Sequence, residues 1–161
     1  MSRYLATDHD YNLWVLLRQT RDAIIKARAR ELQQYGISSI QAAVLFTIQA
    51  IGDSATPAEI SRRLIREPHS VSELLSRMER EGLIKRVKDL PRKNQVRVLI
   101  TDKGRQAYEQ STEREAIHRI MSVLSEEEHQ QLRSCLEKLR DEALRQVGIR
   151  HKPPFPPPQS A

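Results

Sequence analysis

The fold is decided by residues 56–101, TPAEISRRLIREPHSVSELLSRMEREGLIKRVKDLPRKNQVRVLIT, in which the spacing of the apolar residues changes once. Up to Gly82 they recur every three or four positions, which is typical of amphipathic helices. After Gly82 apolar and polar residues alternate, which is typical of strands. This stretch therefore predicts two short helices followed by a two-stranded hairpin.

The two helices have recognisable ends. Thr56 is a suitable N-cap and Pro57 suits the first helical position, and we expect Glu59 to complete a capping box. This helix runs to about Leu64, and Pro68 begins the next one, which ends near Gly82. Two short helices joined by a tight turn make the helix-turn-helix pattern.

The hairpin is expected to have strands at 83–88 and 95–100, joined by a polar, basic loop at 89–94. Such a hairpin after a helix-turn-helix motif is a wing. On the other side, a long helix at 10–35 precedes a helix from about Ser39 to Ile51, which is apolar on most sides and should form the buried centre.

Beyond the wing, one helix from Thr101 to about Leu124 and a last helix after Ser125 are expected, the latter opened by a capping box with Glu128. The fold class is therefore mainly α with a small β-wing: a winged helix-turn-helix with N- and C-terminal dimerisation helices. We expect a winged DNA-binding domain at 36–104, a helical dimerisation region at 1–35 and 105–148, and a disordered Pro-rich tail at 149–161.

The end helices carry apolar stripes that the winged domain does not need, because that domain already has a core helix. An isologous two-fold contact between two copies would bury both stripes. The sequence thus predicts a homodimer, with the interface residues Leu13, Leu17, Ile24, Leu132, Leu136, Leu139 and Ala143.

Basic residues are concentrated in the middle of the chain. The 161 residues carry a formal net charge of +6. Residues 62–105 hold 13 Lys and Arg against 6 Asp and Glu, a net +7, so the remainder is close to neutral. A local basic surface attracts a polyanion. Together with the wing, this indicates double-stranded DNA as the partner.

The second helix of the motif fits the major groove, and its first turn reaches deepest. With Val71 and Leu74 facing the core, the candidates for base contacts are His69, Ser70, Ser72 and Glu73, although Glu73 has an alternative partner in Arg77 four residues on. The candidates for contacts with the DNA backbone or the minor groove are Arg66, Arg77, Arg80, Lys88, Arg92, Lys93 and Arg97.

The wing region resembles that of the MarR family of regulators, on the residues GLIKR at 82–86 and VLITDKG at 98–104. The resemblance covers roughly residues 10–147 and implies a transcriptional regulator that is expected to act as a repressor and to be released by a small aromatic ligand. The two-fold symmetry of the dimer predicts an inverted repeat as its operator. In one departure, the positions at which the family has Asp, a variable residue and Arg hold Arg92, Lys93 and Asn94. The wing-tip arginine role would then fall to Arg92 or Lys93.

Other chemistry has little support in the sequence. There is no Gly-rich phosphate loop, nucleophile motif or His-Glu-x-x-His, so neither an enzyme nor a cofactor is expected, and the histidines lack metal-ligand spacing. Cys135 is predicted to be buried, and Trp14, Phe46 and Tyr108 to pack in the core rather than line a ligand cavity. No apolar run approaches the roughly 20 residues of a membrane span, and a cytoplasmic location is expected. The alternative function is a winged-helix module for protein contacts without DNA binding.

Overall fold

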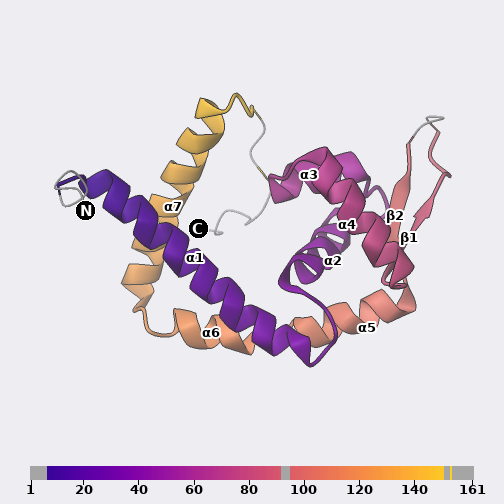
Figure 1. The fold of residues 1–161 in the computed structure, drawn as a ribbon, viewed down its shortest axis with the longest axis horizontal. Helices are drawn as coiled ribbons and strands as arrows, with labels where there is room; N and C mark the ends of the chain where they lie inside the picture. Colours follow the sequence, from indigo (N-terminus) through magenta and orange to yellow (C-terminus); the bar gives the residue numbers. More distant parts are fainter. Residues whose placement is uncertain (1–6, 92–94, 151–152, 154–161) are drawn as a thin grey trace.

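The computed structural model describes residues 7–91, 95–150 and 153. The elements follow in the order α1 (His9–Gln33), α2 (Ser39–Ile51), α3 (Pro57–Leu64), α4 (Pro68–Arg80), β1 (Ile84–Val87), β2 (Arg97–Ile100), α5 (Asp102–Ser111), α6 (Glu115–Met121) and α7 (Glu126–Gln146). In Figure 1, α2 to α5 and the two strands form one group, and α1, α6 and α7 form the other side of the molecule. This confirms the expected mainly helical fold with a small β-wing.

Helix α2 lies at the centre of the hydrophobic core, as its composition predicts. Ser38 caps it, accepting a hydrogen bond from the amide of Gln41, whose side chain accepts one from the Ser38 amide. Its buried apolar residues pack with those of α3, α4, α5 and both strands; the largest fully buried side chains are Leu32, Val44, Leu45, Ile60, Val71, Leu75, Met78, Ile84 and Val98. The core therefore fixes the position of the helix-turn-helix motif.

The wing is an antiparallel pair in which Ile84 lies opposite Ile100 and Val87 lies opposite Arg97. Both strands are shorter than the sequence predicts, because regular pairing does not reach their outer ends. The base of the wing is tied to the domain, since the Val98 amide donates to the carbonyl of Ala55 at 2.8 Å.

Helix α5 packs very closely against the base of the wing at Gly104. A Cβ atom placed on Gly104 would lie 1.9 Å from the carbonyl oxygen of Leu83 and 2.9 Å from a side-chain carbon of Ile100. Only glycine allows this approach. Ala107, one turn further along α5, is buried in the same core, so α5 packs with the winged unit.

The single helix expected from Thr101 to Leu124 is wrong, because the structure breaks it into α5 and α6. Arg114, at the N-cap of α6, has the left-handed conformation with φ of 49°. This conformation costs a residue with a side chain roughly 1–2 kcal/mol. Residues 112–114 contain neither glycine nor proline, so the sequence carries no local signal for the break.

Two further expectations need correction. Thr56 caps α3 by accepting from the Glu59 amide, but the Glu59 carboxylate pairs with Arg62 and Arg63 instead of completing a capping box. Cys135 is exposed rather than buried, because α7 buries only Leu144 among the described residues. The wing-tip residues Arg92 and Lys93, and most of the Pro-rich tail, lie outside the described residues.

Candidate nucleic-acid interface

Helix α4 divides into a buried face and an exposed face along the line that the sequence predicts. Its buried residues are Val71, Leu74, Leu75 and Met78. The four candidates for base contacts, His69, Ser70, Ser72 and Glu73, are all exposed. The structure therefore brings them together on the first turns of one helix, facing away from the core.

The exposed face of α4 is hollowed. Residues from three turns of the helix, among them Ser72, Ser76 and Arg77, line a surface hollow of about 450 Å³. The Glu73 carboxylate lies 3.2 Å from Nε2 of His69, so its side-chain contact is with His69 rather than with Arg77, the partner that the sequence suggested. Arg77 is thus left pointing outward from the helix and exposed.

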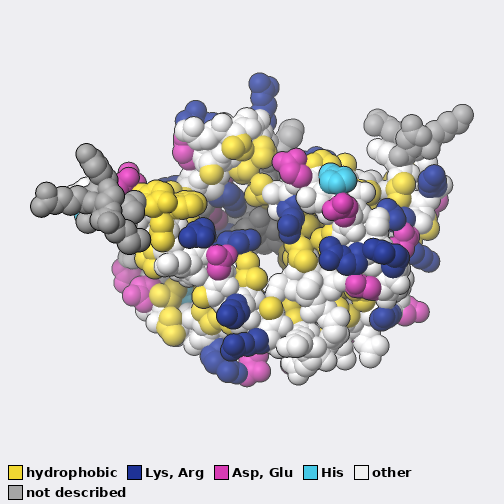
Figure 2. Space-filling view, viewed as in Figure 1, with side chains coloured by type: hydrophobic (Ala, Val, Ile, Leu, Met, Phe, Trp, Pro, Cys, Tyr) yellow, Lys and Arg dark blue, Asp and Glu magenta, His cyan; other side chains and the backbone are white. Residues whose placement is uncertain are grey.

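Basic side chains flank this face. Arg66, Arg77, Arg80 and Lys88, four of the candidates for backbone contacts, are exposed. Figure 2 shows Lys and Arg side chains gathered over α4 and the base of the wing, with single acidic side chains between them. Arg77 and Arg80 lie on α4 itself, and Arg66 and Lys88 lie just before α4 and just after β1, so this surface carries positive charge that suits phosphates beside a groove.

Arg97 has a different environment from the other candidates. Its guanidinium forms a two-point ion pair with Asp89 across the wing, and its Nη1 lies 3.4 Å from the carbonyl of Asp53. The hydrogen bond from Arg97 lowers the pKa of the Asp89 carboxyl, and the same bond raises the pKa of the Arg97 guanidinium. Arg97 therefore holds the loop-side end of the paired strands, and an Asp–Arg pair is present there although the family positions hold other residues.

The C-terminal half of α4 is held against β1 by a charged pair that the sequence reading did not identify. Glu79 accepts hydrogen bonds from the amide and the guanidinium of Arg86, at 2.7 to 2.9 Å. The hydrogen bond from the Arg86 side chain is the largest cause of a lowered pKa for Glu79, followed by the bond from the amide. This pair fixes the recognition helix relative to the wing.

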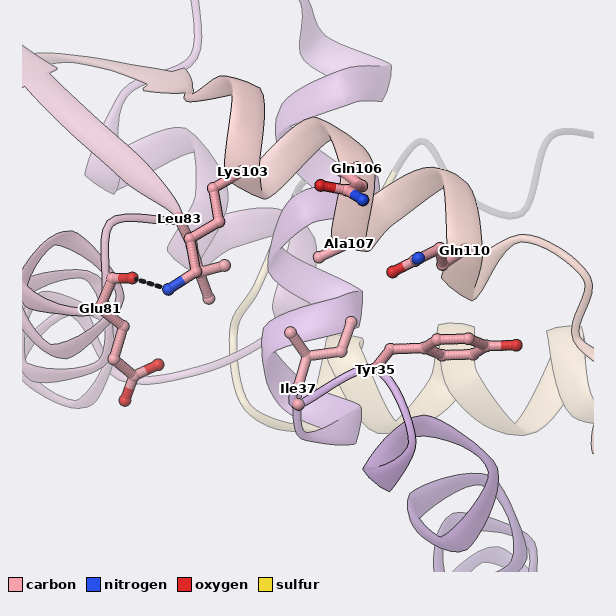
Figure 3. Close-up of a pocket in the computed structure, with 9 residues that line it drawn as sticks. Tyr35, Ile37, Glu81, Leu83, Lys103, Gln106, Ala107 and Gln110 are labelled. Carbon is pink, nitrogen blue, oxygen red and sulfur yellow. Dashed lines mark hydrogen bonds between the residues drawn. The ribbon is translucent and has the colours of Figure 1, made fainter.

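The end of α4 is also tied to α5. Figure 3 shows Lys103 reaching from α5 to Glu81, whose carbonyl accepts from the Lys103 ammonium at 2.8 Å. The Glu81 carboxylate accepts from the side chain of Gln41 at 2.5 Å, which links it to α2. Glu81 and Lys103 line a pocket of about 370 Å³ together with Gln106 and Gln110. The effect of these contacts is to hold the recognition helix on the domain's core.

Most of the expected interface residues lie together on the other side of the molecule. Leu13, Leu17, Leu136, Leu139 and Ala143 line one apolar groove of about 680 Å³ between α1 and α7. Trp14 lines the same groove and is 53% exposed, so it does not pack in the core as expected. Leu132 is exposed as well, and in Figure 2 hydrophobic side chains gather at the N-terminal half of α1.

Ile24, the remaining interface candidate, is half-buried and lines a second apolar pocket, of about 370 Å³, between α1, α2, α5 and α6. Phe46 and Tyr108 also line it, so they contribute to a cavity wall rather than only to the core. The guanidinium of Arg114 lies 5.7 Å from the centre of the Phe46 ring. The buried hydroxyl of Ser39, on the wall of this pocket, has no hydrogen-bond partner among the residues that the structure describes.

Comparison with known proteins identifies the family to which this chain belongs. A model of the MarR family matches residues 35–92. The organohalide-sensing transcriptional regulator RdhR-CbdbA1625, solved with 2,4-dichlorophenol bound, is 33% identical, with 89% of this chain and 86% of that chain covered and a TM-score of 0.82. The chain belongs to the MarR family.

Other solved MarR-family structures share the fold. MepR of S. aureus, in complex with DNA, is 28% identical over 80% of this chain and 96% of that chain, with a TM-score of 0.73. A MarR mutant from E. coli with operator DNA is 21% identical over 80% and 93% of the two chains, with a TM-score of 0.75. Comparison with curated protein sequences gives no match.

Family membership makes this MarR-family protein a transcriptional regulator and not an enzyme. Among the described residues, no three His, Cys, Asp or Glu side chains are grouped so that they would hold a metal ion. Within the same residues, no helix is both long enough and apolar enough to span a membrane.

Proposed function

We propose that this MarR-family protein is a homodimeric, sequence-specific DNA-binding repressor that acts in the cytoplasm and is released from its operator by a small aromatic ligand. The observation that carries the proposal is the division of α4. Its apolar face is fully buried in the core, and its polar face is exposed between exposed arginines. MepR and MarR, which share this fold, are solved with DNA.

Each part of the exposed face has a role in this proposal. Ser70, Ser72 and His69 hydrogen-bond base edges in the major groove, and Glu73 accepts from the amino group of a cytosine after parting from His69. Arg66, Arg77, Arg80 and Lys88 contact phosphates and set the register of the protein on the duplex. Arg92 and Lys93 keep the wing-tip role that the sequence predicts for them.

The dimer in this proposal is formed by α1, α6 and α7, with the winged unit extending through α5. The groove between α1 and α7 exposes Leu13, Trp14 and Leu139 by half or more of their surface. Contiguous exposed apolar surface on a soluble protein marks an interaction site. A second copy related by a two-fold axis covers this surface on both chains at once, and the operator is then an inverted repeat with half-site centres about 10 base pairs apart.

The ligand in this proposal occupies the pocket lined by Phe46 and Tyr108. The pocket has apolar walls, and its polar groups include the buried hydroxyl of Ser39 and the guanidinium of Arg114, a combination that suits an aromatic ring with one polar substituent. The related RdhR-CbdbA1625 binds 2,4-dichlorophenol. Calorimetric titration with chlorinated phenols should give binding that Ser39→Ala weakens. A panel of phenols without any effect on DNA affinity contradicts the release mechanism.

The competing function, a winged helix used only for protein contacts, is distinguished by DNA binding itself. We expect the full chain to bind a random-sequence duplex with an affinity that falls steeply with salt, because the exposed arginines release counterions. Sedimentation of the free protein at micromolar concentration should give a dimer. Salt-independent or absent DNA binding supports the protein-contact module instead.

A further inference from the structure

The chain passes between the winged unit and the α1, α6 and α7 side at the break between α5 and α6, at the turn from α1 to α2, and after α7, where Ile149 and Pro153 lie beside α3. At a helix end, backbone groups lack partners within the helix and must find them elsewhere. At the break between α5 and α6 the partners come from α1. The first two of these passages are therefore connected to each other through side chains.

Arg28 supplies the first connection. It is buried, and its Nη2 donates to the backbone carbonyl of Ser111, the last residue of α5. Its Nη1 donates to the Glu31 carboxylate at 2.5 Å. One planar guanidinium thus holds the end of α5 with one nitrogen and a neighbouring carboxylate with the other.

Glu31 supplies the second connection. Its Oε1 accepts from the amide of Ala116, in the first turn of α6, at 3.4 Å. The side chains of Arg28 and Glu31 are only 11% and 12% exposed, so solvent screens the pair little. Burial raises the pKa of Glu31, but the hydrogen bonds from Arg28 and the amides outweigh it and leave this pKa below its ordinary value.

We propose that the Arg28–Glu31 pair is a latch that fixes the angle at the α5–α6 break, and that both are positioning residues for DNA recognition. The latch caps the end of α5 and the start of α6 from a third helix, across Arg114 in its left-handed conformation. The proposal rests on the proposed function, because the angle matters only when two recognition helices must meet two half-sites at a fixed spacing.

The latch also borders the pocket under α2. Arg28, Ser111 and Arg114 all line that pocket. A change in the latch is therefore a local event beside the cavity with a distant effect on the orientation of α4.

The first experiment compares DNA duplexes with one and with two half-sites, selected from random DNA with the wild-type full chain. Arg28→Met removes both donations, and Arg28→Lys keeps the charge but loses the two-pronged geometry. We expect Arg28→Met to weaken binding to the two-half-site duplex by about tenfold or more, within the usual range of coupling between sites, and to leave binding to the one-half-site duplex nearly unchanged. The affinity of Arg28→Lys for the two-half-site duplex should lie between those of the wild type and Arg28→Met.

Arg21→Met is the matched control, since it makes the same change on the same helix. The ion pair of Arg21 with Asp22 is 70% and 54% exposed, and we expect its loss to leave both affinities unchanged. An equal loss of Arg28→Met on both duplexes would mean that Arg28 only stabilises the fold and would overturn the proposal. The proposal would also be overturned if Arg28→Met bound both duplexes as tightly as the wild type does.

A second measurement needs neither DNA nor a dimer. Spin labels on Ser72→Cys in α4 and Ser134→Cys in α7, in a Cys135→Ser chain diluted with unlabelled protein, report the distance across the break by pulsed electron resonance. Arg28→Lys and Glu31→Gln should broaden or shift this distance distribution, and an unchanged distribution overturns the latch. If the wild type fails to bind DNA, the proposed function fails while this measurement still decides on the latch.

Discussion

The recognition helix and its flanking arginines should respond differently to salt, and this difference tests their assigned roles. Arg77 is exposed on α4, and the nearby Glu73 carboxylate contacts His69 rather than Arg77. Replacing Arg77 with Ala removes one expected phosphate contact from each subunit. In a dimer two contacts are lost, and the slope of log K against log salt concentration becomes shallower by roughly 1.8.

Ser72→Ala on the same helix should leave that slope unchanged. Ser72 is neutral, so it releases no counterion, but it supplies a hydrogen bond to a base edge. Its loss should weaken binding to the cognate site by about 1–3 kcal/mol and have little effect on scrambled DNA. The two variants therefore differ in kind and not only in size.

The assay is a salt titration of each variant on the selected operator and on scrambled duplex, followed by fluorescence anisotropy. Arg30→Ala, at an exposed position on α1, is the control for a lost positive charge away from the interface and should leave both slopes as in the wild type. If Ser72→Ala changes the slope while Arg77→Ala does not, the two roles are reversed. If neither variant affects binding, α4 is not the recognition helix.

Three other substitutions test the packing, the acid response and the dimer. Gly104→Ala should lower the free energy of unfolding in urea by about 3 kcal/mol or more, because the new Cβ meets the Leu83 carbonyl at 1.9 Å; a loss below 1 kcal/mol, of order of a surface change, would show that α5 can shift. The lowered pKa of Glu31 stabilises the folded state above its unfolded value of 4.5, and this contribution is lost as the pH falls through the folded-state pKa. Glu31→Gln should therefore flatten the acid side of the stability curve, and an unaltered curve would rule this out. Leu139 is 53% exposed, so covering it in a dimer gains about 1 kcal/mol per chain, and Leu139→Ala should raise the dimer dissociation constant roughly 30-fold in sedimentation equilibrium; an unchanged constant would place the interface elsewhere.

The parts of this fold that the sequence could predict are those set by local chemistry. The caps at Thr56 and Ser125 follow from hydroxyls that accept from an amide three residues on. The change from helical to alternating spacing at Gly82 predicted the wing, and the four apolar residues of α4 predicted which side chains of that helix are exposed. Each of these patterns is read within a few residues.

The parts of the fold that the sequence could not predict depend on contacts between distant segments. The break at Arg114 is satisfied by Arg28 and Glu31, more than 80 positions earlier, and no spacing rule connects them. The exposure of Cys135 reflects the few contacts of α7 within one chain. The pocket that joins Phe46 to Tyr108 forms only when α1, α2 and α5 meet.

The central claim is that two copies of this chain read an inverted repeat through α4. Selection of bound fragments from random DNA, with the full-length protein at physiological salt, tests it most directly. The account predicts that the recovered fragments share two half-sites in inverted orientation, with centres about 10 base pairs apart. Fragments with one asymmetric site, or no enrichment of any sequence, would contradict it.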